Sequence, residues 1–139
     1  MSYDVVVSGL GAVTPIGVGL EAYAEGLRAG RCGVGRITRF DASAYRSQAA
    51  AELLGDVCFP RASEVGLPQT QRYGRTAAFG LAALAEALHT AGLGVDALAD
   101  SRTGLCFGGS TAGTPEAEID LLELQDGEDY WSVVEPAAF

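Results

Sequence analysis

The sequence contains no lysine. Arginine supplies all nine basic residues against 18 acidic ones, and the formal net charge at pH 7 is −9. A chain this acidic lacks the positive surface that binds phosphate backbones or anionic membranes. We therefore expect neither a nucleic-acid partner nor a membrane partner.

Long apolar runs are also missing. The stretches Val5–Val7, Ala77–Leu88 and Val133–Phe139 are all too short to span a bilayer. A secretory signal would show a basic segment followed by an apolar core, and we see no such pattern. Because 48% of the residues are hydrophobic and 19% charged, the composition is that of a globular chain. We expect a cytoplasmic protein.

Cysteine is scarce and unpatterned. Cys32, Cys58 and Cys106 lie far apart and form no C-x-x-C pair, so neither a disulfide framework nor a zinc site is indicated. In a reducing compartment we expect three buried or half-buried thiols. Cys106 lies within an apolar run, where a packed core thiol is expected rather than an activated nucleophile.

The hydrophobic pattern predicts an α/β layered fold. Tyr3–Ser8 is a β-branched run without alternation, typical of a strand buried on both faces. A helix is expected at Leu20–Ala29, with Gly30 as its stop. The stretch "RITRF" is expected to be extended, and Ser47–Leu54 is an ambiguous segment.

The longest expected helix is Arg72–Leu93, whose residues are apolar or small on nearly every face. Only Glu86, His89 and Thr90 break this pattern in the later turns, so the helix is expected to be buried on most sides. A strand at Arg102–Phe107 should follow. A second helix is then expected from the N-cap Thr114 to about Gln125.

A glycine-rich turn follows the first expected strand, in "DVVVSGLGAVTPIG". A dinucleotide-binding fingerprint needs three glycines in G-x-G-x-x-G. Gly9 and Gly11 fit, but Thr14 stands at the third position and Pro15 follows it. A structural turn is therefore favoured over a phosphate-binding loop.

Ser110 in "GGSTAG" has the strand-to-helix context of a nucleophile elbow, but Ala112 replaces the second glycine of G-x-S-x-G. The only histidine, His89, belongs near the C-terminus of a helix, where positive charge is tolerated. A serine hydrolase is therefore disfavoured.

The acidic side chains of the later helix indicate a solvated face rather than an acid–base or metal site; they are Glu116, Glu118, Asp120 and Glu123. No cofactor or metal is expected.

Four segments together resemble the N-terminal part of the β-ketoacyl–acyl carrier protein synthases, the condensing enzymes of fatty-acid and polyketide assembly. They are "GLGAVTPIG", "GVGRITRFD", "RYGRTAAFGLAALAEAL" and "GLCFGGSTAG", in the order and at the spacing of that family. The resemblance extends over essentially the whole chain. It implies a thiolase-like fold with α-β-α-β-α layers, usually dimeric, of which residues 1–139 are the N-terminal region.

The resemblance implies an acyltransferase that elongates acyl chains by decarboxylative Claisen condensation. Neither Cys106 nor His89 matches the family's nucleophilic cysteine or its two histidines, which are expected beyond residue 139. We therefore expect one half of a split ketosynthase, a processed fragment or a truncated ketosynthase. Its expected partners are a complementary ketosynthase chain, in a homo- or heterodimeric assembly, and an acyl carrier protein.

An alternative is a non-catalytic scaffold or chain-length factor, the ketosynthase-like partner subunit of some polyketide systems, which "GLPQTQRYGRTA" also resembles. Many ketosynthases have an acidic residue where Gly74 stands, and more basic residues before it. The carrier-protein contact that the resemblance implies is thus reduced to Arg72 and Arg75.

By its place in the glycine turn, Thr111 matches the family position at the inner end of the acyl tunnel. Its neighbours Ser110, Ala112 and Gly113 would shape the same wall. The segment Tyr130–Phe139 resembles the one that passes near the dimer interface.

Overall fold

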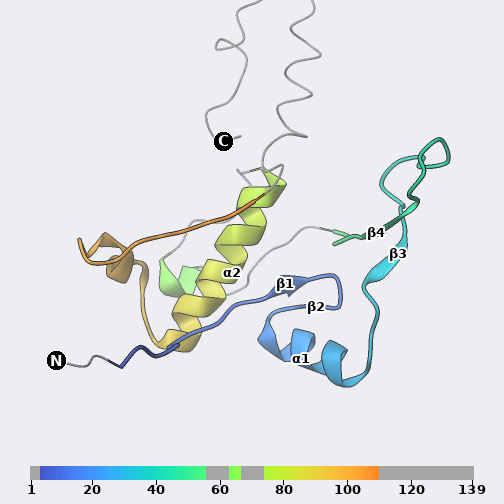
Figure 1. Cartoon of the computed structure of the whole chain (residues 1–139). Coiled ribbons are helices and arrows are strands. Elements are labelled where there is room, and N and C mark those ends of the chain that lie inside the picture. Colours follow the sequence, from blue (N-terminus) through green and yellow to red (C-terminus); the bar gives the residue numbers. More distant parts are fainter. Residues whose placement is uncertain (1–3, 56–62, 67–73, 110–139) are drawn as a thin grey trace, which may run out of the picture.

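The computed structural model describes residues 4–55, 63–66 and 74–109. In chain order its elements are β1 (Val13–Thr14), β2 (Gly17–Val18), α1 (Leu20–Arg28), β3 (Val34–Arg36), β4 (Ala49–Ala51), η1 (Ser63–Val65), α2 (Arg75–Ala91) and η3 (Val95–Ala99), where η marks a 3₁₀ helix. Figure 1 shows α2 at the centre, with the two β-hairpins and α1 to one side of it. No helix among the described residues is long and apolar enough to cross a membrane.

Helix α2 confirms the long helix expected from the sequence. It ends at Gly92, whose φ of +69° is a left-handed conformation that glycine adopts without steric cost. The Gly92 amide donates to the His89 carbonyl at 3.0 Å, and the Leu93 amide donates to the Leu88 carbonyl at 2.9 Å. This pair of bonds satisfies the last carbonyls of the helix.

Helix α1 is also confirmed, at Leu20–Arg28. The chain leaves it through Gly30, which has a φ of +63° and donates its amide to the Leu27 carbonyl at 3.0 Å. Gly26 is buried in the middle of the helix. A Cβ there would lie 2.6 Å from the Ile16 carbonyl oxygen, so glycine lets α1 pack directly on the turn between β1 and β2.

Two short antiparallel pairs make up the described sheet structure. Strand β1 pairs with β2 across a tight turn, and the Thr14 hydroxyl donates to the Gly17 carbonyl at 2.8 Å. Strand β3 pairs with β4, with Gly35 opposite Ala50. The ambiguous segment near residue 50 is therefore a strand, while only the first residue of "RITRF" belongs to β3.

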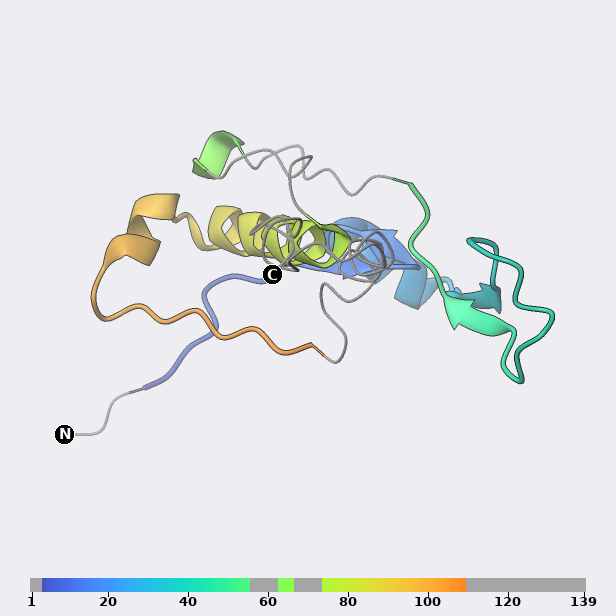
Figure 2. The ribbon, with the colours of Figure 1, turned by 90° about the horizontal axis from the view of Figure 1, so that it is seen from above.

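Neither of the strands expected at Tyr3–Ser8 and Arg102–Phe107 is a strand among the described residues. Residues 4–10 and 103–109 run as extended segments that pair with no other strand. Val5 is 97% exposed and Phe107 is 70% exposed. Figure 2 shows both segments crossing the same side of α2, with η1 on the opposite side. A strand is buried on both faces only between neighbouring layers, and the described residues supply α2 alone.

The expectation that α2 is buried on most sides is wrong for the same reason. Among its described residues only Ala82, Ala85 and Leu88 are buried. Ala85 and Leu88 form the core cluster with Val65 of η1, and Leu84 and Leu98 pack against it. The remaining faces of the helix are apolar or small but partly open to solvent.

Candidate functional site

The candidate tunnel residues Ser110, Thr111, Ala112 and Gly113 lie outside the described residues, as does Arg72. The same is true of Cys58, the acidic segment from Glu116 to Glu123 and the segment Tyr130–Phe139. The candidates that the structure places are the glycine turn, Arg75, His89, Cys32 and Cys106.

The glycine turn is used for packing against α2. A Cβ on Gly9 would lie 2.8 Å from the Ala91 side chain and would overlap the Ala87 carbonyl oxygen. A Cβ on Gly11 would lie 2.8 Å from the Ala83 carbonyl carbon and would overlap that residue's oxygen. Glycine is therefore required at both positions because the turn lies directly on the helix backbone. The glycines thus have a packing role, as favoured from the sequence, while the turn itself lies at residues 15–16, between β1 and β2.

Glu86 of α2 joins the turn to α1. One carboxylate oxygen accepts a hydrogen bond from the Ala12 amide at 2.9 Å, and the other accepts one from the Leu20 amide at 2.7 Å. Leu20 is the first residue of α1, whose N-cap Gly19 has no side chain to cap it. The carboxylate of Glu86 thus caps α1 from another helix, where negative charge is favoured by the helix dipole.

Thr90, one turn after Glu86, holds the same segment from the same face of α2. Its hydroxyl accepts a hydrogen bond from the Leu10 amide at 3.0 Å and lies 2.9 Å from the Leu10 carbonyl oxygen. Two side chains of α2 therefore bind backbone groups of the segment that runs from Leu10 to the start of α1. Sequence reasoning noted both residues as breaks in an apolar pattern and missed this role. The available signal was a lone carboxylate among small residues.

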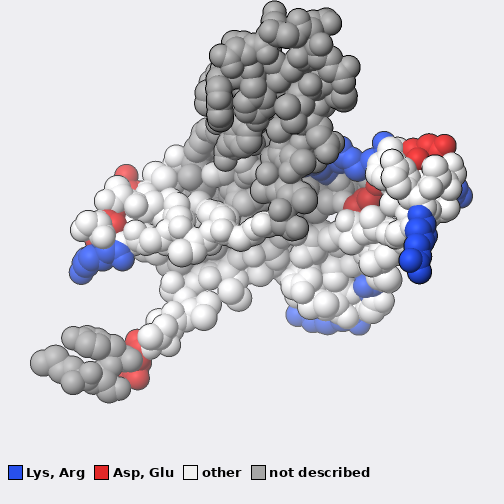
Figure 3. All heavy atoms as spheres, turned by 45° about the horizontal axis from the view of Figure 1, so that its top comes forward, with Lys and Arg blue, Asp and Glu red and all other residues white. Residues whose placement is uncertain are grey.

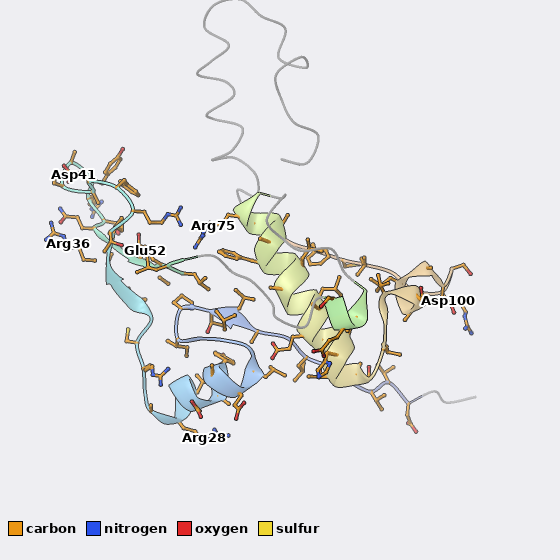
Figure 4. All side chains as sticks on the ribbon, turned by 180° about the vertical axis from the view of Figure 1, so that it is seen from behind. Arg28, Arg36, Asp41, Glu52, Arg75 and Asp100 are labelled. Carbon is orange, nitrogen blue, oxygen red and sulfur yellow. The ribbon has the colours of Figure 1, made fainter. Side chains whose placement is uncertain are left out.

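Arg75 begins α2 and ties it to the end of β4. Its guanidinium donates to the Leu53 carbonyl and, at 3.0 Å, to the Gly55 carbonyl. It also lies over the Phe79 ring, 5.0 Å from the centroid, in a cation–π arrangement. Figure 4 shows Arg75 reaching from the start of α2 toward the side on which Glu52 lies. These contacts hold the guanidinium in a defined position.

His89 lies in the last turn of α2, as the sequence predicts. Its Nδ1 is 3.6 Å from a carboxylate oxygen of Glu64 in η1, an ion pair when the imidazole is protonated. The pair links η1 to the C-terminal end of α2, next to the core cluster.

The two described cysteines correct a sequence expectation. Cys32 and Cys106 are free thiols, and both are exposed rather than buried. Cys106 lies in the extended segment 103–109, which pairs with no strand among the described residues, so no core encloses it. The part of the chain that the structure describes holds no group of three or more potential metal ligands.

Glu52 organises the loop between β3 and β4. Its carboxylate accepts hydrogen bonds from the Thr38 hydroxyl at 2.8 Å, from the Thr38 amide at 3.0 Å and from the Arg39 amide at 3.2 Å. The Thr38 hydroxyl contributes most to lowering the pKa of Glu52 below its ordinary 4.5, followed by the two amides and the charge of Arg39.

This lowered pKa predicts an acid-sensitive loop. A carboxyl whose pKa is lower in the folded state stabilises the fold above its unfolded pKa of 4.5, and the stabilisation is lost as the pH falls through the folded value. We expect the amide protection factors of Thr38 and Arg39, measured by NMR, to fall as the pH is lowered below 4.5. In Glu52→Gln protection should be low at every pH. Acid-independent protection in the unsubstituted chain would contradict this role.

Comparison with known proteins shows the family to which this chain belongs. Residues 2–137 match the family model "Beta-ketoacyl synthase, N-terminal domain". The chain therefore belongs to the β-ketoacyl synthase family through that domain, and its fold is that of the N-terminal region of a thiolase-like ketosynthase.

Individual relatives come from polyketide and fatty-acid biosynthesis. A protein of Streptomyces coelicolor, named as an actinorhodin polyketide β-ketoacyl synthase 1, is 36% identical over 129 residues, which are 93% of this chain and 27% of the relative. The 3-oxoacyl-[acyl-carrier-protein] synthase 2 of Synechocystis sp. is 36% identical over 122 residues, 88% of this chain and 29% of that protein.

One solved structure, the ishigamide ketosynthase/chain length factor, superposes with a TM-score of 0.61 and 26% identity. The match covers 96% of this chain and 32% of that one. The chain thus spans about a third or less of the length of the relatives that it matches.

Proposed function

We propose that this chain forms the N-terminal part of a β-ketoacyl–acyl carrier protein synthase in polyketide or fatty-acid biosynthesis. The observation that carries the proposal is the family match over residues 2–137. The reaction would join an acyl group held as a cysteine thioester to a malonyl-carrier thioester. Loss of CO₂ generates the carbon nucleophile, the new carbon–carbon bond forms at the acyl carbonyl, and the cysteine thiolate is released.

In this proposal the cysteine and two histidines come from ketosynthase residues outside these 139, on the same polypeptide or on a complementary chain. The thiolate attacks, and the histidines stabilise the thioester enolate. Residues 1–139 supply part of the layered core, Thr111 and its neighbours line the tunnel, and Arg72 and Arg75 contact the carrier protein. The assembly is dimeric and cytoplasmic and uses no cofactor.

The two extended segments beside α2 support assembly with further ketosynthase residues. Val5, Val6 and Val7 are 97%, 79% and 79% exposed, and the backbone of this segment pairs with no strand among the described residues. An exposed β-branched segment of this kind is a site where another strand can add. Leu105 and Phe107 are exposed on a second extended segment, on the same side of the helix.

A second function is a chain-length-factor-like subunit that sets tunnel depth without catalysing condensation. It is supported by the likeness to the ishigamide ketosynthase/chain length factor. The two functions differ in where the nucleophilic cysteine lies. In a ketosynthase it lies in the condensing unit that this chain helps to form. In a chain-length factor it lies only on a separate, complete ketosynthase.

The experiment is to purify the chain with its natural partners and identify what is retained. The ketosynthase proposal is supported if the chain forms a tight complex with a second chain that carries a T-A-C-type motif. It is equally supported if the same polypeptide continues into such a motif. Retention of a separate, complete ketosynthase supports the chain-length-factor function. Purification of the chain from its natural source with neither of these would refute both.

Product length tests the tunnel position. In an active assembly, Thr111→Phe should shorten the acyl products, because a larger side chain at the inner end of a tunnel leaves less room for the growing chain. The products are identified by mass spectrometry. Thr76→Phe is the matched control, since Thr76 is exposed on α2. Unchanged product length in Thr111→Phe would remove this residue from the tunnel.

A further inference from the structure

The loop between β3 and β4 presents two aromatic side chains to solvent. Phe40 and Tyr45 are 56% and 63% exposed, and their rings meet edge to face with centroids 5.8 Å apart and an interplanar angle of 84°. Figures 1 and 2 show this loop at one end of the molecule, away from α2. Exposed aromatic residues held in a fixed pair are typical of the centre of a protein interface.

The loop has a defined internal structure. The Ile37 amide donates to the Gln48 carbonyl at 2.9 Å, and the Tyr45 amide donates to the Ala42 carbonyl at 3.0 Å. The Ala42 side chain is buried beneath the turn, with 7% exposure. The aromatic pair is therefore presented by a pre-organised frame, which lowers the entropy cost of binding.

Positive charge surrounds the pair. Arg36, Arg39 and Arg46 are exposed, and none forms a salt bridge with a carboxylate among the described residues. We call Phe40 and Tyr45 with these three arginines the hairpin tip. Figure 3 shows arginine atoms on the surface at this end of the molecule. Although the whole chain is acidic, eight of its nine arginines lie between positions 28 and 75.

Two carboxylates of the same loop, Asp41 and Glu52, accept hydrogen bonds from groups of the loop, and Asp41 is exposed. Asp41 accepts a hydrogen bond from the Ser43 amide at 3.0 Å, and that bond, with one from the Ser43 side chain, lowers the pKa of Asp41. Glu52 binds Thr38 and the Arg39 amide, as described above, and the charge of Arg39 contributes to lowering its pKa. Three arginines stand against these two carboxylates between residues 36 and 52, so the charge of the loop is positive.

We propose that the hairpin tip docks an acidic protein surface, with the arginines contacting carboxylates around an apolar side chain that packs on the Phe40–Tyr45 pair. At physiological ionic strength charges are screened beyond roughly 8 Å. The local arginines, rather than the net charge of −9, therefore govern a partner at this loop. Such complementary charge speeds encounter and fixes orientation, while the aromatic residues supply buried area. The proposal does not depend on ketosynthase activity.

Two labelled peptides of equal length test both parts of the surface by fluorescence anisotropy with the full chain. One alternates glutamate with leucine on a helical pattern, and the other has serine in place of leucine. The unsubstituted chain should bind the leucine peptide more tightly, and 0.5 M salt should weaken both. The triple variant Arg36→Gln, Arg39→Gln, Arg46→Gln should weaken both peptides by about tenfold. Phe40→Ser with Tyr45→Ser should weaken only the leucine peptide.

Arg102→Gln is the matched control. Arg102 pairs with Asp100 at 2.9 Å, and Figure 4 shows Asp100 at the opposite end of the molecule from Arg36 and Asp41. Removing this charge should leave both affinities unchanged. Far-ultraviolet circular dichroism checks that each variant keeps its helices. Should the triple variant lose them, the single Arg46→Gln serves in its place, because no hydrogen bond of the described chain uses that side chain.

Three results would overturn the proposal. Unchanged affinity in the hairpin-tip variants would show that the peptides bind elsewhere. An equal loss in Arg102→Gln would show binding to arginine without a built surface. A concentration-dependent dimer, detected by light scattering and abolished by the hairpin-tip substitutions, would make a second copy of the chain the occupant instead.

Discussion

Replacing Glu86 with alanine should lower the free energy of unfolding of this chain by about 3 kcal/mol, or its melting temperature by about 10 °C. The substitution removes both acceptors of the Ala12 and Leu20 amides at once. A hydrogen bond to a charged group contributes about 1.5–3 kcal/mol, and an amide left without a partner adds a desolvation cost. Urea unfolding followed by circular dichroism at 222 nm measures the change.

Two conservative variants separate the carboxylate's role from its volume. Glu86→Gln keeps the size and one acceptor oxygen, so it should lose roughly half of the stability that alanine loses. Thr90→Val keeps the shape of Thr90 but not its hydroxyl, and should cost about 1 kcal/mol through the bond to the Leu10 amide. Equal stability of Glu86→Ala and the unsubstituted chain would show that the bridge between α2 and α1 contributes nothing.

Gly11→Ala should destabilise the chain by about 3 kcal/mol, through overlap rather than through a lost bond. The added methyl group would overlap the Ala83 carbonyl oxygen, a backbone atom of α2 that cannot move away alone. To accept it, the turn must separate from the helix, which also lengthens the bonds that Glu86 and Thr90 make to the turn. The midpoint of urea unfolding and the protection of the Ala12 amide should fall together.

Gly35→Ala provides the matched control. Gly35 lies in β3, and a Cβ there would have no atom within 4 Å. This substitution should change stability by less than about 1 kcal/mol, and toward greater stability if the restriction of the unfolded chain dominates. A similar loss in both variants would mean that close approach to α2 is not why Gly11 is glycine.

Helical periodicity was the most reliable guide to this fold. It located α1 and α2 to within a few residues, because each has a continuous pattern and a glycine with positive φ at or just after its C-terminal end. The strands at Tyr3–Ser8 and Arg102–Phe107 were expected from short local runs of apolar residues. A β-branched run specifies an extended backbone, but its burial depends on neighbouring layers that a local sequence pattern does not encode.

The polar contacts were the least predictable part. Glu86 reaches Leu20 across 66 positions of sequence, and Thr90 reaches Leu10 across 80. No spacing rule connects residues so far apart, whereas the near-miss of the glycine fingerprint at Thr14 did point to a structural turn. The resemblance carried by the four sequence segments gave the family, which the family match over residues 2–137 confirms.

The bridge from Glu86 to Leu20 also sets an order of events during synthesis. Helix α1 has nine residues, and isolated helices shorter than about 12–15 residues are marginal in water. Its cap is translated 66 positions later, which at roughly 5–20 residues per second is a delay of several seconds. We therefore expect α1 to become stable only once α2 has emerged from the ribosome. A nascent chain stalled before residue 86 should leave α1 open to proteolysis, whereas one stalled well after it should protect the helix.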